Sequence, residues 1–143
     1  MTRAQPVSLR IPEEAREVIL EAARRTGRDF SSVANEMLLE AVRMRRIPGI
    51  LFADGPTGRR ARVAGTGLDV FEVVRAFREV DQSWDRLRAA FDWISETQLR
   101  AALAYAEAYP EEIDQRLRDE DRWNREATWT RYPFMRPQPP SAG

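Results

Sequence analysis

The stretch that decides the fold lies near the N-terminus, where residues 7–12 read VSLRIP. Apolar and polar side chains alternate over residues 7–11, and this period of two predicts a β-strand with Ser8 and Arg10 on one face. The nearby sequence offers no partner strand, so the simplest partner is the same strand of a second copy. The pair would form a two-stranded antiparallel ribbon, and a ribbon of this width fits the major groove of B-DNA.

Two amphipathic helices are predicted after this strand. Pro12 suits the first turn of a helix, Gly27 suits a left-handed C-terminal cap, and Asp29 can cap a second helix whose apolar face runs through residues 30–41. One strand and two helices in about 40 residues cannot enclose a core, so we expect an obligate homodimer. The alternative is an ordinary edge strand packed on two helices, with Arg10 merely solvated.

Residues 5–46 resemble a ribbon-helix-helix DNA-binding domain, the superfamily of the Arc, MetJ and CopG repressors. The resemblance rests on the strand ending in Pro12, the turn at residues 26–29 and the serine pair that opens the second helix. It implies that outward strand residues read bases and that the start of the second helix binds a phosphate, as the helix dipole also favours. The first base-reading position of the family falls on Pro6, which offers no polar side chain. The expected DNA-contacting residues are Arg3, Ser8, Arg10, Arg28, Phe30, Ser31 and Ser32.

Composition narrows the possible functions. The 143 residues suit one domain or two small ones, and the 23 basic and 23 acidic side chains cancel. Residues 1–47 carry nine Arg and seven acids, whereas residues 48–143 carry fourteen Arg and sixteen acids, which suits a dimer that binds DNA by one face. The chain has no Cys and no His, so we expect no enzymatic activity, catalytic residue, metal or cofactor. Without a long apolar run or signal sequence, we expect a cytoplasmic protein with no membrane partner.

A second domain is predicted over residues 48–126. Residues 50–52 read as a short strand, residues 54–58 as a turn, and residues 59–63 as the returning strand of a hairpin. The three arginines of the returning strand, Arg59, Arg60 and Arg62, form either a phosphate-binding patch or a hairpin edge protected by charge.

Four helices should follow this hairpin. The spacing of apolar residues predicts the first over 69–80; Ser83 can cap the second, and Ser95 with Gln98 forms a capping box for the third, over 96–109. The third helix has a net charge of −1, which disfavours a helix-turn-helix DNA reader and favours dimerisation or protein interaction.

The fourth helix begins at Pro110, and Glu111, Glu112 and Asp114 follow in or near its first turn. These carboxylates could bind a cation, but acids at this position are expected for capping and dipole reasons.

Residues 48–117 resemble a small helical domain that recurs in VapB-type antitoxins. The resemblance rests on Pro48-Gly49-Ile50, on the Gly65-Thr66 turn, on Leu68 and Val70, and on the pattern LAYA at residues 103–106. It implies a type II antitoxin whose cognate toxin is a PIN or PIN-like ribonuclease.

The tail over residues 127–143 changes character, with three aromatic residues, two Arg, four Pro and no acid. Prolines interrupt regular structure, while aromatic residues and Arg dominate interface hot spots, so we interpret the tail as an irregular strip that folds onto a partner. The alternative is a frayed terminus. The expected partner-binding residues are Trp123, Trp129, Arg131, Tyr132, Phe134, Met135 and Arg136.

Together these patterns predict a mostly α protein with three parts. They are a dimeric ribbon-helix-helix domain over 1–47, a small hairpin and helical domain over 48–126, and an irregular toxin-binding tail over 127–143. The expected function is an antitoxin that neutralises a ribonuclease toxin and represses its own operon by binding double-stranded operator DNA. The alternative is a stand-alone repressor whose second half senses a ligand or oligomerises. An RNA-processing enzyme is poorly supported without His or Cys.

Overall fold

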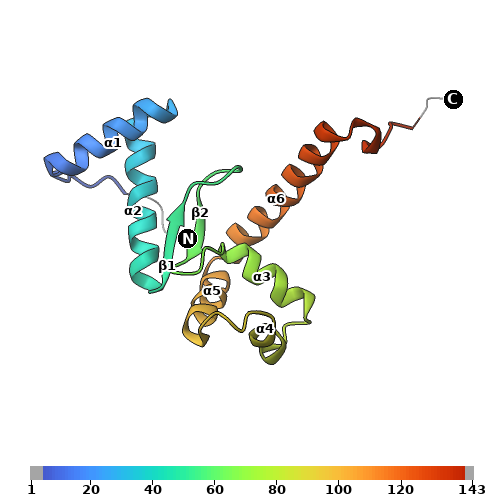
Figure 1. Cartoon of the computed structure of the whole chain (residues 1–143). Coiled ribbons are helices and arrows are strands. Elements are labelled where there is room, and N and C mark those ends of the chain that lie inside the picture. The colour runs from blue at the N-terminus through green and yellow to red at the C-terminus, as the bar shows by residue number, and fades with distance from the viewer. Residues whose placement is uncertain (1–4, 141–143) are drawn as a thin grey trace. The chain divides into compact units, whose positions relative to one another are not determined.

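The chain is described here by a computed structural model over residues 5–140, in which the helices and strands are labelled as in Figure 1. The chain divides into two compact units, Met1–Val42 and Arg43–Gly143. The boundary between the units lies near the end of the helix Phe30–Arg46, whose last turn belongs to the second unit. Within the described residues the protein is mostly helical with a small two-stranded sheet, which confirms the predicted mostly α class.

The first unit holds helix α1, Glu13–Thr26, and most of helix α2, Phe30–Arg46. Helix α1 has Glu13 and Glu14 in its first turn, and it ends on Gly27, whose φ of 67° is the left-handed conformation that glycine adopts without strain. Both helices and the turn between them agree with the sequence prediction.

Residues 5–12 have no regular secondary structure in the single chain, although the alternating pattern predicts a strand there. A strand needs a hydrogen-bonding partner, and the predicted partner is a second copy, so one chain by itself does not form the ribbon. The apolar face of the segment is uncovered: Val7 is 83% exposed and Leu9 is 68% exposed. Among the described residues of this unit, only Ile19 and Val33 are buried apolar side chains.

The second unit opens with a hairpin of strands β1, Ile50–Ala53, and β2, Arg60–Val63. The strands are antiparallel, with Ile50 opposite Val63 and Ala53 opposite Arg60, as the turn residues between them predict.

Helices pack against this hairpin and against one another. Helix α3 spans Val70–Glu79, α4 spans Trp84–Ala90 and α5 spans Glu96–Ala108. The predicted caps are present, because Ser83 accepts a hydrogen bond from the backbone of Arg86 and Ser95 forms a capping box with Gln98. The core lies between the hairpin, α3 and α5. Its most deeply buried side chains are Val63, Val70, Val73, Leu87, Leu99, Ala102 and Tyr105.

Helix α6, Pro110–Arg131, is the longest helix in the described part of the chain. It begins at the predicted proline but runs past residue 127, so the prediction of an irregular tail from that point is wrong for residues 127–131. A short 3₁₀ helix, η1, follows at Pro133–Met135. Helix α6 stops two residues before Pro133 because a proline disfavours helical conformation in the residue that precedes it. No helix within residues 5–140 combines the length and apolar character needed to cross a bilayer.

Candidate functional site

The first candidate surface is the segment before α1, where base contacts are predicted. Ser8 and Arg10 are exposed, and Arg3 lies outside the described residues. Beside this segment lies an open apolar groove of about 560 Å³. Its lining includes Leu9, Ile11, Val18, Met37 and Leu38, which come from the segment and from both helices. The apolar face of the N-terminal segment and the helices beside it thus share one uncovered surface.

The predicted phosphate site at the start of α2 is only partly available. The backbone N–H of Ser32 donates to Asp29 Oδ1 at 2.7 Å, so the cap occupies one of the groups expected to bind phosphate. This hydrogen bond, followed by one from the Ser32 side chain, holds the pKa of Asp29 below its usual range, so the carboxylate is charged at neutral pH. A phosphate at this helix end would therefore face a negative charge.

Two other residues predicted to contact DNA are less available, because Arg28 is bonded within the unit and Phe30 is partly buried. Arg28 Nη1 lies 2.8 Å from Glu36 Oε2, and Arg28 Nη2 donates to the carbonyl oxygen of Ser32. Phe30 is half-buried, whereas Ser31 is exposed. Within residues 5–140, the predicted DNA-contacting residues whose side chains are exposed and form no hydrogen bond or ion pair are therefore Ser8, Arg10 and Ser31.

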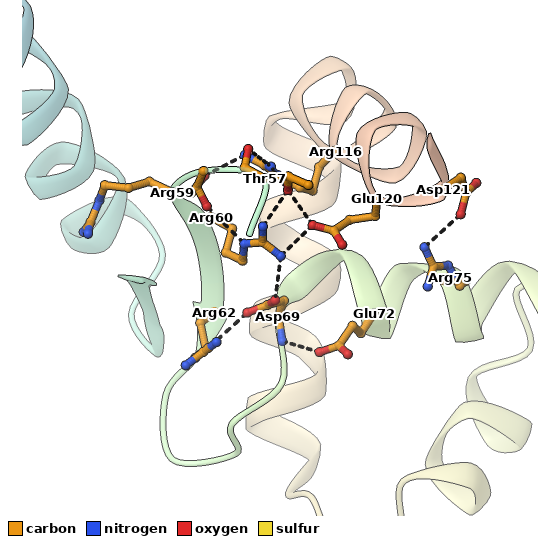
Figure 2. A network of polar contacts seen from close by, with 11 residues as sticks. Thr57, Arg59, Arg60, Arg62, Asp69, Glu72, Arg75, Arg116, Glu120 and Asp121 are labelled. Carbon is orange, nitrogen blue, oxygen red and sulfur yellow. Dashed lines mark hydrogen bonds and ion pairs between the residues drawn. The ribbon is translucent and has the colours of Figure 1, made fainter. Parts of the chain in front are cut away.

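A buried polar network in the second unit was not anticipated from the sequence (Figure 2). Arg60 is 5% exposed, and its guanidinium contacts carboxylates from two helices: Asp69, which caps α3, and Glu120 in α6. The Nη1 atom of Arg60 lies 2.6 Å from Glu120 Oε1 and 3.4 Å from Asp69 Oδ2. Arg62 also pairs with Asp69, at 3.0 Å. The arginines of strand β2 thus form internal ion pairs, and neither the phosphate patch nor the solvated edge describes Arg60.

The hydroxyl group of Thr57 lies at the centre of this network. It accepts hydrogen bonds from Arg60 and Arg116 and donates one to Glu120 Oε1 at 2.6 Å. Arg116 adds a hydrogen bond from Nη2 to the carbonyl oxygen of Arg59, at 2.7 Å (Figure 2). Two side chains of α6 therefore hold the hairpin loop. Breaking a buried ion pair by removing one partner costs about 3–5 kcal/mol, so the pair between Arg60 and Glu120 is a strong constraint.

A second polar cluster connects α2, α5 and α6. The Tyr105 hydroxyl donates to Glu112 Oε2 at 2.5 Å, and Arg43 Nη1 lies 2.9 Å from the same oxygen. Burial of Tyr105, together with its hydrogen bond to the negatively charged Glu112, raises the pKa of the phenol above its usual range. Asp114 pairs with Arg78 at 2.6 Å. Glu112 and Asp114 therefore make structural ion pairs, as their position in α6 suggests.

Another candidate surface is formed by the end of α6 and by η1. From Asp121 to Pro140 every residue is exposed except Trp129, which is half-buried. Tyr132 and Phe134 form an edge-on aromatic pair with centroids 6.1 Å apart, and Arg136 lies over the ring of Trp129 at 5.6 Å. Arg131 lies over Tyr132, and Phe134 is 84% exposed. Trp123 and Met135 are also exposed, so the predicted partner-binding side chains lie along one accessible stretch of chain.

Sequence reasoning missed Asp69, Glu120, Thr57 and Arg116. The cap of α3 had a local signal, because Asp69 is followed three residues later by Glu72, which completes a capping box. The partnership of Arg60 with Glu120 had no such signal, since sixty residues separate them along the chain. Comparison with protein-family models, with curated proteins and with solved structures gave no match to this chain.

Proposed function

We propose that this chain is a DNA-binding repressor of the ribbon-helix-helix type that also binds and neutralises a protein toxin. The DNA-binding part of this proposal rests on one observation, the uncovered apolar surface of the first unit. Leu9, Leu38 and Leu39 are each more than half exposed, while two apolar side chains of the described part of that unit are buried. A unit of this size needs further burial to be stable, which supports a partner that covers the groove.

The occupant of the groove that we propose is a second copy of the chain. The N-terminal segment alternates apolar and polar side chains, and two such segments side by side would pair their backbones and cover both apolar faces. The same pairing would place Ser8 and Arg10 of both copies on the opposite, polar face. Arg10 is the only one of these side chains that can make a bidentate contact with guanine.

The second half of the proposal concerns the exposed end of α6. Aromatic and Arg side chains on an accessible strip are the residue types that dominate protein interfaces. The resemblance to VapB-type antitoxins implies a PIN or PIN-like ribonuclease as the partner, an enzyme class that holds divalent metal with carboxylates. Arg131 or Arg136 placed among those carboxylates would compete electrostatically with the metal.

The alternative function, a repressor that senses a ligand, has less support. No buried side-chain N or O atom in residues 5–140 lacks a hydrogen-bond partner, so the core of the second unit presents no polar group waiting for a ligand. A groove between α3 and α6 is lined by ion-paired residues, including Arg75 with Asp121 and Arg78 with Asp114.

The proposal is tested with the full chain and the promoter of its own gene. Sedimentation equilibrium should show a dimer, and Leu9→Asp should unfold the first unit because it places a charge in the covered face. Arg10→Ala should cost about 1–3 kcal/mol of operator binding in a competition gel shift and relax specificity at one position of each half-site.

Arg24→Ala is the matched control, since it removes an exposed arginine of α1 that pairs with Glu21. It should leave discrimination between operator and random DNA unchanged. A monodisperse wild-type monomer, or an Arg10→Ala protein that discriminates as well as wild type, would refute the DNA-binding half of the proposal.

A further inference from the structure

Helix α6 has two halves with different environments. The first half is packed, with Ile113 3% exposed and Glu120 7% exposed. Within the described residues, the last ion pair that joins this helix to the rest of the unit is that between Asp121 and Arg75, at 3.2 Å. After this residue the helix continues to Arg131 with every side chain except that of Trp129 exposed, and Figure 1 shows it extending away from the other helices of the unit. We call residues 122–136 the arm.

The arm is too short to form a stable helix by itself. Its helical part, residues 122–131, reads RWNREATWTR, in which strong helix formers (Arg, Glu and Ala) are mixed with modest ones (Trp, Asn and Thr), and this length is below that of a stable isolated helix in water. Starting a helix is costly because several residues must be ordered before the first hydrogen bond forms, whereas extending an existing helix adds one bond per residue. The arm therefore depends on the packed half of α6 as its nucleus.

The junction between the two halves coincides with the network around Arg60, which we call the clamp: Thr57, Arg60, Asp69, Arg116 and Glu120. Glu120 enters the clamp one residue before the last packed position, and Arg116 enters it one helical turn earlier. Since Arg60 lies in strand β2, the clamp fixes the end of the packed half of α6 to the hairpin (Figure 2). A rotation or shift of α6 at this point would separate buried charges.

The surface of the arm indicates the chemistry of what it binds. Residues 122–136 carry four Arg and one Glu, a net charge of +3, directly after the acidic run Asp119-Glu120-Asp121. Trp129 and Arg136 line a shallow groove of about 460 Å³, and Phe134 projects from η1. A complementary surface would be an apolar groove with carboxylates at its rim.

We propose that the clamp is a positioning device that presents the arm as an already formed basic helix, which docks into an apolar, acid-rimmed groove of a protein partner. The clamp residues do not touch the partner; they act through α6. The docking step rests on the proposed function, whereas the positioning step is a property of the chain by itself.

The positioning step is tested on the full chain without a partner. The chain has no Cys, so Thr97→Cys in α5 and Thr128→Cys in the arm give two unique spin-label sites, both exposed. Double electron–electron resonance, with labelled chains diluted in unlabelled ones, should show one narrow distance distribution. Glu120→Leu should broaden it, because Arg60 then loses its carboxylate partner in α6 and Thr57 keeps only Arg116 of its two partners in that helix.

Thr57→Val is the second variant, and it keeps every charge of the clamp while removing the hydroxyl that joins Arg60, Arg116 and Glu120. It too should broaden the distribution, with the core helices retained by circular dichroism. Asp121→Leu is the matched control, since it breaks the neighbouring but exposed pair with Arg75, and it should keep the narrow distribution. A broad wild-type distribution, or equal widths in all four proteins, would overturn the positioning role.

The docking step is tested with the protein encoded beside this gene as the probe, using a fluorophore at Thr128→Cys. Saturable binding, slower in association for Thr57→Val than for Asp121→Leu, supports docking of a formed helix. Equal association rates would overturn it, even if the distance measurement succeeds. Binding of a single-stranded oligonucleotide in place of that protein would assign the arm to nucleic acid and overturn the protein-partner assignment.

Discussion

Tyr105 is a fully buried phenol that contacts two charged side chains. It is 0% exposed, it donates to Glu112, and it accepts a hydrogen bond from Arg43 at 3.1 Å. Arg43 also lies over the ring of Tyr109, at 4.2 Å. The last turn of α2 is thereby tied to α5 and α6 through a single guanidinium group. A hydroxyl shared between a cation and an anion supports the fold only while it keeps its proton.

The pH dependence of stability follows from this contact. Burial, and then the hydrogen bond to Glu112, raise the pKa of Tyr105 in the folded chain above the value of about 10 in the unfolded chain. The folded state therefore holds this proton more tightly, and the stabilisation is complete below pH about 10 and is lost as the pH rises beyond it. Urea unfolding of the wild type between neutral pH and pH about 11 should show this alkaline loss, and Tyr105→Phe should flatten it.

The hydroxyl also contributes a hydrogen bond to a charged group, so Tyr105→Phe should lower stability at neutral pH by about 1.5–3 kcal/mol. Tyr132→Phe, on the exposed arm, is the control and should keep the wild-type pH profile. An unchanged alkaline slope in Tyr105→Phe would contradict the assignment.

Single residues with local roles could be predicted, and those with distant partners could not. Gly27, Asp29, Ser83 and Ser95 act within a few positions of themselves, so the sequence around each one carries the signal. Arg60 is different, because its burial depends on carboxylates that only the tertiary fold brings close. A guanidinium with no partner in its own hairpin is indistinguishable, in sequence, from a solvated one.

At the scale of elements, the start of α2 combines a helix cap with a predicted phosphate site. Asp29 caps the helix through the backbone of Ser32, yet its charge opposes a phosphate at the same helix end. Asp29→Asn keeps an oxygen that can cap the helix and removes the charge. If the start of α2 contacts the DNA backbone, Asn should tighten binding to operator and random DNA alike, by about two- to fivefold at low salt.

The measurement is fluorescence anisotropy with labelled duplexes at two salt concentrations. Glu21→Gln removes one negative charge from α1 in the same unit and should change affinity less. Equal effects of the two substitutions would mean that no phosphate lies at the start of α2, and would leave DNA contact to the N-terminal segment.

Helices and strands were predicted correctly where residues close to them in the sequence determine them. Capping residues, turn glycines and apolar spacing predict both strands of the hairpin and the start of each helix. Two elements differ from the prediction. Residues 7–11 form no strand, because the described part of the chain offers them no strand to pair with. Helix α6 continues beyond its packed residues because a helix that has already started extends at little cost, and it ends shortly before Pro133.

At the scale of the whole molecule, the proposed DNA and protein contacts belong to separate units. Removal of residues 122–143 takes away the exposed end of α6 but none of the clamp and none of the residues up to Val42. The truncated chain should therefore bind its promoter like the wild type in a gel shift, and should fail to rescue growth when co-expressed with the protein encoded beside it.

Trp93→Ser is the control for this truncation, because Trp93 is an aromatic side chain of the second unit that is 60% exposed and distant in sequence from the arm. It should keep both activities. Full rescue by the truncated chain would mean that residues before 122 inhibit the partner. Loss of both activities would show that residues 122–143 belong to the fold.

The clamp also constrains which residues can occupy the hairpin loop. A Cβ atom at position 55 would overlap the guanidinium of Arg60, which is held in place by its buried partners, so Gly55 is required for space. Among diverging descendants of this chain, position 55 should therefore stay glycine for as long as position 60 stays arginine. Lineages that exchange Arg60 for a shorter side chain should be the ones in which alanine or serine appears at position 55, and the carboxylate at position 120 should disappear from those same lineages.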